Sequence, residues 1–94
     1  MLIVWGSIEA KAENIEEVMQ LSLEHVRRSR REAGCISHSV QSDREHVSPP
    51  IFFEEWEDMR VLQAHLKLAE SQDLVASVAI GPPNMKIFTA SQVS

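Results

Sequence analysis

The hydrophobic pattern of the chain switches between a period of two and a period near 3.6, and the order of these switches limits the fold more than any other feature. Residues 2–9 alternate in the way typical of a strand. Residues 14–33 instead place apolar side chains at steps of three and four, which predicts a long amphipathic helix. Residues 35–41 and 51–56 return to the strand pattern, on either side of a polar loop that ends in two prolines.

The C-terminal part adds a second helical segment and a last strand. Residues 59–70 carry a helical stripe, and a second start signal at Ser71 and Asp73 opens another helical stretch. Residues 84–90 have the strand pattern. The order strand, helix, strand, strand, broken helix, strand predicts an α+β, ferredoxin-like βαββαβ fold with a four-stranded antiparallel sheet. We expect one domain over residues 1–94.

Polar residues mark the expected helix ends. Asn14, with Glu17 three positions further on, has the spacing of a capping box, and Gly34 follows the first helix as a residue that tolerates a left-handed stop. Asp58 suits the N-cap of the second helix. Four arginines near the end of the first helix suit the negative helix C-terminus, and we expect them in solvent, with an anion site as the alternative: Arg27, Arg28, Arg30 and Arg31.

The period of two also assigns side chains to the faces of the sheet. In the second strand it places His38 with Ile36 and places Cys35 on the opposite face. Three residues of the third strand share one face: Phe52, Glu54 and Trp56. A lone Cys35 cannot form an internal disulfide, and we expect it to behave as a small, buried hydrophobic residue.

The apolar residues on both faces of the predicted sheet indicate that the chain associates with a second copy of itself. Both helices of this fold lie on one face of the sheet, yet the strands carry apolar residues on both sides. A large exposed apolar patch is rare in a stable monomer. We therefore expect a homodimer in which the two free sheet faces stack.

Charge and hydropathy exclude several partners and compartments. The chain has 14 acidic residues against 9 lysines and arginines, a net charge of -5, which does not favour nucleic acid. No apolar stretch approaches the length that a bilayer requires, and the first residues lack the basic region of a signal peptide. We expect a cytoplasmic protein with no nucleic-acid or membrane partner.

A pocket for a small organic ligand is predicted between the sheet and the helices. Its expected members are Phe52 and Trp56 from the third strand, His38 from the second strand, and His65 from the inward stripe of the second helix. Two neighbours complete the predicted ligand contacts: Glu54 and Leu62. Each of these residues also fits a purely structural role, with Trp56 as plain core and Glu54 paired with an arginine or in water.

Other chemistries fit the sequence less well. Three glycines are too few for a phosphate-binding loop, and no serine has the context of a nucleophile elbow. A metal site from His38, His46 and His65 is conceivable, but no His-x-His or Glu-x-x-His pair would anchor two ligands on one element. We therefore expect no metal.

Two segments of the chain resemble the antibiotic biosynthesis monooxygenase family of dimeric α/β-barrel proteins. The first is "EAGCISHSVQS", in which Gly34 and Cys35 open the second strand, and the second is "FFEEWEDMRVLQAHL". The family has a Glu-x-Trp sequence followed by an acidic residue and a later His-Leu, which here are Glu54, Trp56, Asp58 and His65 with Leu66.

The resemblance implies a homodimeric α/β barrel and a monooxygenase that oxidises a phenolic or quinol-type aromatic with molecular oxygen, without metal, flavin or haem. The deprotonated substrate would itself donate electrons to oxygen, and the protein would orient it and move a proton. By this resemblance Trp56 orients the substrate and His65 is the base or hydrogen-bond partner. Members often have Tyr where this chain has His38, which could replace the phenol as a proton carrier.

Two departures leave other functions open. Haem-degrading relatives bind haem through a late histidine, whereas this chain has no His after His65, so haem degradation is disfavoured. The chain also has no Tyr at all, which supports the alternative of a non-catalytic dimeric module that binds a small molecule or serves a stress response.

Overall fold

The computed structural model describes residues 1–45, 49–68 and 83–94. Within these residues seven elements follow one another, and their bounds are β1 (Leu2–Ser7), a 3₁₀ turn (Ala12–Asn14), α1 (Ile15–Ser29), β2 (Cys35–Gln41), β3 (Ile51–Trp56), α2 (Met59–Lys67) and β4 (Asn84–Thr89). The predicted order of strands and helices is confirmed over these residues.

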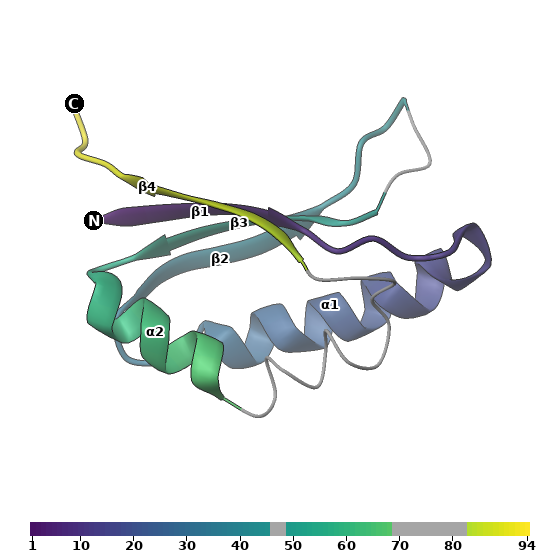
Figure 1. Ribbon diagram of the computed structural model, residues 1–94, viewed down its shortest axis with the longest axis horizontal. Coiled ribbons are helices and arrows are strands. Elements are labelled where there is room, and N and C mark those ends of the chain that lie inside the picture. The colour runs from purple at the N-terminus through teal and green to yellow at the C-terminus, as the bar shows by residue number, and fades with distance from the viewer. Residues whose placement is uncertain (46–48, 69–82) are drawn as a thin grey trace.

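The four strands form one antiparallel sheet in the order β2-β3-β1-β4. Both helices lie against the same face of this sheet, and none of the described residues forms a helix on the opposite face (Figure 1). This is the ferredoxin-like βαββαβ arrangement that the alternation of periods predicts. We call the two faces the helix face and the outer face of the sheet.

The helix face holds two groups of buried apolar side chains. One group contains Trp56 and Leu62 together with two residues of β1, namely Leu2 and Val4. The other group joins Phe52 of β3 to Val26 of α1 and to Ile8, which follows β1. Polar side chains lie between and beside these groups, and they form the site described below.

Helix α1 is shorter than the sequence pattern predicts, and its N-cap differs from the expected capping box. Asn14 has φ of -105° and ψ of 4°, which is not the extended conformation of a capping residue, and its side chain makes no cap hydrogen bond. The helix ends at Ser29 because the chain then tightens into turns in which Glu32 N donates to Ser29 O. Gly34 has φ of 84°, so the predicted left-handed stop is confirmed.

A bulge in β2 corrects the expected faces of that strand. Cys35 pairs with Trp56, but the next paired residue is Ser37, opposite Glu55, so Ile36 is an extra residue on this strand. The prediction that Ile36 shares a face with His38 was therefore wrong. Cys35 instead packs against the core group of Trp56 on the helix face, while Ile36 is exposed.

Helix α2 begins as predicted. Asp58 has extended backbone angles, and its Oδ1 accepts a hydrogen bond from the backbone N–H of Val61 at 3.0 Å. The helix is described up to Lys67, and the second helical start predicted at Ser71 and Asp73 lies outside the described residues. Within the described part of the chain, no helix is both long enough and apolar enough to cross a membrane.

The outer face of the sheet exposes large apolar side chains. Trp5 is 49% exposed and contacts Phe53 edge to face, with ring centroids 6.3 Å apart. Phe88 of β4, which pairs with Ile3, is 50% exposed on the same face. These are the residues that a second copy of the sheet would cover.

Candidate functional site

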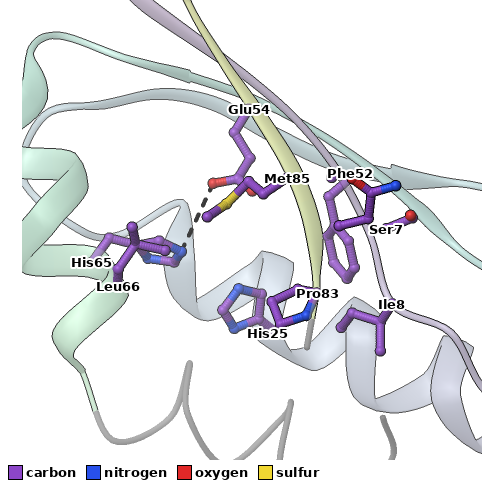
Figure 2. A pocket seen from close by; sticks show the side chains of 11 residues that line it. Ser7, Ile8, His25, Phe52, Glu54, His65, Leu66, Pro83 and Met85 are labelled. Carbon is purple, nitrogen blue, oxygen red and sulfur yellow. Dashed lines mark ion pairs between the residues drawn. The ribbon is translucent and has the colours of Figure 1, made fainter. Parts of the chain in front are cut away.

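A pocket opens between the helix face of the sheet and the two helices (Figure 2). Its volume is about 90 Å³. This is below the ~300–1,000 Å³ typical of ligand pockets, and it approaches the ~150 Å³ of a cavity that holds one benzene ring. The lining residues are Gly6, Ser7, Ile8, His25, Phe52, Glu54, His65, Leu66, Pro83, Asn84 and Met85.

Glu54, in the middle of β3, is the buried carboxylate on which the other polar groups converge. Its Oε1 accepts a hydrogen bond from the indole N–H of Trp56 at 2.9 Å. The same oxygen lies 3.2 Å from Nε2 of His38 and 3.8 Å from Nε2 of His65. Burial acts to raise the pKa of Glu54, but the adjacent His38 and the Trp56 N–H outweigh it, so this pKa lies below its ordinary value. Glu54 is therefore a buried anion at neutral pH.

His65 reaches the site from the inward side of α2, and a second carboxylate holds its ring. Its Nδ1 lies 2.9 and 3.0 Å from the two carboxylate oxygens of Glu32, in the turn after α1. Because a carboxylate only accepts hydrogen bonds, Nδ1 carries a proton and donates it to this contact. The Nε2 atom is then the lone-pair side of the ring when His65 is neutral, and it faces Glu54 (Figure 2).

His38 reaches the site from β2 and is 2% exposed. The backbone is fixed beside it, since Nε of Arg30 donates to the carbonyl oxygen of His38 at 2.9 Å. Its Nε2 has the contact with Oε1 of Glu54 at 3.2 Å, whereas Nδ1 has no hydrogen-bond partner among the described residues. Such a buried polar group is costly unless something pairs with it.

His25 of α1 is a member of the site that the sequence reasoning missed. It lies seven positions after Val18 and three after Ser22, both buried, so the helical spacing already placed it on the inward stripe. Burial lowers the pKa of His25 from 6.5 to about 4, and the nearby rings of His38 and His65 act in the same direction. His25 is therefore neutral at physiological pH.

Three histidines thus meet from three different elements, α1, β2 and α2. The ring centroids lie 5.3 Å apart for His25 and His38, 5.2 Å for His25 and His65, and 5.5 Å for His38 and His65. One ring nitrogen of each lies within 4.8 Å of the others. We call this set the histidine cluster. His46, which the sequence reasoning considered in place of His25, lies outside the described residues.

The six predicted site residues occupy two layers. Phe52, Glu54 and His65 line the pocket, and Phe52 contributes an aromatic wall. The other three lie behind the lining: His38 as part of the histidine cluster, and Trp56 and Leu62 in the adjoining core group, both fully buried. Glu32 was also missed, because nothing in its local sequence shows that it faces a histidine 33 positions away.

The arrangement can hold and move protons beside an aromatic ligand. A neutral His65 can accept a proton at Nε2, and Glu32 would stabilise the resulting imidazolium ion. Cys35 is a poor nucleophile, because burial and then the charges of Glu32 and Glu54 raise the pKa of its thiol. The chemistry of the site therefore rests on imidazole and carboxylate groups.

Comparisons with known proteins agree with the fold and the motifs. The sequence profile of the antibiotic biosynthesis monooxygenase (ABM) family matches residues 1–77. Over an alignment 98 positions long, the chain is 31% identical to an uncharacterized protein of Synechocystis sp., sll1783; the match covers 97% of this chain and 64% of that protein. The chain thus spans less than two thirds of the length of this relative.

Solved structures show the same fold. A crystal structure of an antibiotic biosynthesis monooxygenase is 25% identical, with a TM-score of 0.85 over 98% of this chain and 100% of that chain. A candidate antibiotic biosynthesis monooxygenase from Deinococcus radiodurans is 21% identical and has a TM-score of 0.91, over 100% of this chain and 96% of that chain. Since the family profile matches most of the sequence, the chain belongs to the antibiotic biosynthesis monooxygenase family.

Proposed function

We propose that this chain is a monooxygenase that oxidises a phenolic or quinol-type aromatic with molecular oxygen, and that the reaction needs no metal, flavin or haem. The observation that carries the proposal is His65, a buried histidine held by Glu32 at the wall of a pocket that Phe52 also lines. Membership of the ABM family supports the reaction class. The proposed protein acts as a cytoplasmic homodimer of single-domain chains over residues 1–94.

The proposed reaction begins with a proton transfer. Nε2 of His65 takes the hydroxyl proton of the bound quinol, while Glu32 stabilises the charged ring. The anion then reduces oxygen and forms a carbon–oxygen bond at the ring. Loss of water completes the overall change of quinol plus O₂ to hydroxyquinone plus water, so the substrate supplies all the electrons.

The proposed substrate contacts follow from the two layers of the site. Phe52 packs on the face of the aromatic ring, and Leu66 closes the apolar side of the pocket. Trp56 acts through Glu54, because its N–H fixes the carboxylate that lies near both His38 and His65. The small volume of the pocket favours a ligand with a single ring over a multi-ring polyketide.

Oxygen consumption by chelator-treated protein tests the proposal. We expect turnover with at least one member of a panel of single-ring quinols, and a loss of about 10²–10⁴-fold in kcat for His65→Gln. Gln63→Ala, an exposed residue on the same helix, is the matched control and should keep full activity. Phe52→Leu should raise KM more than it lowers kcat, because it removes ring contact area.

The opposite outcome identifies the second candidate function. If quinols bind, as measured by calorimetry, but no oxygen is consumed by the wild-type protein, the chain is a non-catalytic binding module of the same fold. His38 at the place of a Tyr common in the family is the feature that favours this alternative.

A further inference from the structure

We infer that the histidine cluster, His25, His38 and His65, is a binding site for a divalent first-row transition metal ion such as Zn²⁺. One ring nitrogen from each residue lies within 4.8 Å of the others, and all three side chains are buried. Imidazole nitrogen is the ligand that Zn²⁺, Co²⁺ and Ni²⁺ share. The inference concerns binding alone and does not depend on the oxidation proposed above.

His38 provides the first independent support for a ligand. Its side chain is fully buried, and Nδ1 has no hydrogen-bond partner among the described residues, while the polar contact of Nε2 is Oε1 of Glu54 at 3.2 Å. In native proteins a buried polar group of this kind is normally paired with protein, water or an ion. A metal ion between the three rings would accept a lone pair from His38 and so provide the polar partner that this buried ring lacks on one side.

The other two rings are held in states that suit metal binding. Glu32 fixes the proton of His65 on Nδ1, which leaves Nε2 free on the side of Glu54. Carboxylates hold metal-binding histidines in this manner in many proteins. His25 makes a long contact of 3.4 Å from Nε2 to the hydroxyl of Ser29, whose own proton is donated to the carbonyl of His25. Ser29 therefore acts as acceptor, and Nδ1 of His25 keeps its lone pair.

Charge balance also favours a cation at this position. Two buried or half-buried carboxylates flank the cluster, Glu54 on the sheet side and Glu32 on the helix side. Two arginines carry positive charge near the cluster, Arg30 at the carbonyl oxygen of His38 and Arg28 near His25, but both are exposed to solvent. The histidines themselves bind metal only when they are neutral. A divalent ion would offset the charge of these two carboxylates, and Oε1 of Glu54 lies 3.2 Å from Nε2 of His38 and 3.8 Å from Nε2 of His65.

The geometry requires only a small closure of the site. Ligand nitrogens about 2.0–2.1 Å from a tetrahedral Zn²⁺ lie roughly 3.3 Å from one another. The observed limit of 4.8 Å therefore exceeds the final spacing by roughly 1.5 Å. Rotation of side chains on three separate elements can supply this movement without a change of backbone.

A bound ion would compete with the proposed proton transfer. It would occupy Nε2 of His65, the atom assigned to take the proton of the substrate. Protein that holds the ion should therefore consume no oxygen with the quinol substrates. Metal binding and turnover are thus separate measurements, and either can fail without the other.

The experiment titrates Zn²⁺ and Co²⁺ into chelator-stripped protein that carries no polyhistidine tag. We expect one ion per chain by calorimetry, visible d–d absorption of the Co²⁺ form and a rise of Tm with metal concentration. His25→Gln should weaken Zn²⁺ binding at least tenfold, and Glu32→Gln should weaken it by about 10–100-fold. Ser22→Ala, buried one turn before His25 on α1, is the matched control and should bind as the wild type does.

Two results would overturn the inference. One is the absence of Zn²⁺ and Co²⁺ uptake by the wild-type protein. The other is unchanged affinity in a folded His25→Gln variant, particularly if His46→Ala abolishes binding. If His25→Gln does not fold, NMR of the wild type with Co²⁺ decides: the ring signals of His25, His38 and His65 should broaden, and broadening of His46 alone would place the ion elsewhere.

Discussion

At the scale of single residues, His25 shows how burial changes the acid stability of the fold. Its pKa is about 4 in the folded chain and 6.5 when unperturbed, so between these values the unfolded chain binds a proton that the folded chain does not. The contribution of His25 to the free energy of unfolding is therefore fully present above pH 6.5, and it is lost as the pH falls toward 4. The loss should be about 3 kcal/mol by pH 4.

This pH dependence can be assigned with one variant. Urea unfolding of chelator-treated wild type should show a falling free energy of unfolding between pH 6.5 and about 4, and His25→Gln should have a flatter profile over the same range. Parallel profiles for the two proteins would mean that other groups cause the loss.

Gly34 is fixed by two separate constraints. Its φ of 84° is strained for any residue with a Cβ, and a Cβ at this position would lie 2.6 Å from both γ-carbons of Val61. We expect Gly34→Ala to lower the free energy of unfolding by about 2–4 kcal/mol. Adding Val61→Ala removes the clash but keeps the backbone strain, so the double variant should be less destabilised than the two single changes added together. If the losses of unfolding free energy of the two single variants simply add up in the double variant, Gly34→Ala does not cause a clash with Val61.

At the scale of elements, the start of α2 depends on a single side chain. Asp58 accepts the backbone N–H of Val61, which would otherwise lack a partner within the helix. Asp58→Ala should cost about 0.5–2 kcal/mol of stability. Glu57→Ala, the preceding exposed acidic residue, is the control and should change thermal unfolding little. Equal losses for both variants would show that charge, rather than capping, is responsible.

The elements that the sequence predicted well are those with strong local signals. The bounds of β3 and the cap at Asp58 agree with the predictions, because strand alternation and helix capping depend on residues that are close together in the sequence. The end of α1 and the bulge at Ile36 did not follow from the pattern. The end of α1 follows from tight turns after Ser29, which the helical period does not reveal. The bulge depends on how β2 pairs with β3, and a period of two cannot reveal one extra residue in a strand.

The site was only partly predictable for a related physical reason. Phe52, Glu54 and His65 were placed on inward faces by local periodicity, and they line the pocket. Which of the four histidines meet depends on the packing of α1, β2 and α2 against one another. Spacing within any one element could not choose His25 over His46.

At the scale of the whole molecule, the outer face of the sheet predicts the assembly. The half-exposed Trp5 and Phe88, with Phe53 beside Trp5, form an apolar surface that a second copy can cover. We expect sedimentation equilibrium at micromolar concentration to give twice the chain mass of 10.6 kDa. Trp5→Glu should shift the protein toward the monomer.

A control variant distinguishes association through the outer face from nonspecific hydrophobic association. Met59→Glu also places a charge at an exposed apolar residue, 43% exposed, but on α2 rather than on the outer face. It should leave the mass unchanged. A wild-type protein that sediments as a monomer would show that the exposed face is tolerated in water.

The positions of the two tryptophans make the protein its own optical probe. Trp56 is fully buried beside a carboxylate, whereas Trp5 is half-exposed on the outer face. Emission from Trp56 should be blue and resistant to soluble quenchers, and emission from Trp5 should be red and accessible until that face is covered. A Trp5→Phe chain would then report only on the interior, and a Trp56→Phe chain only on the surface, so events at the pocket and at the outer face can be timed separately with these two variants.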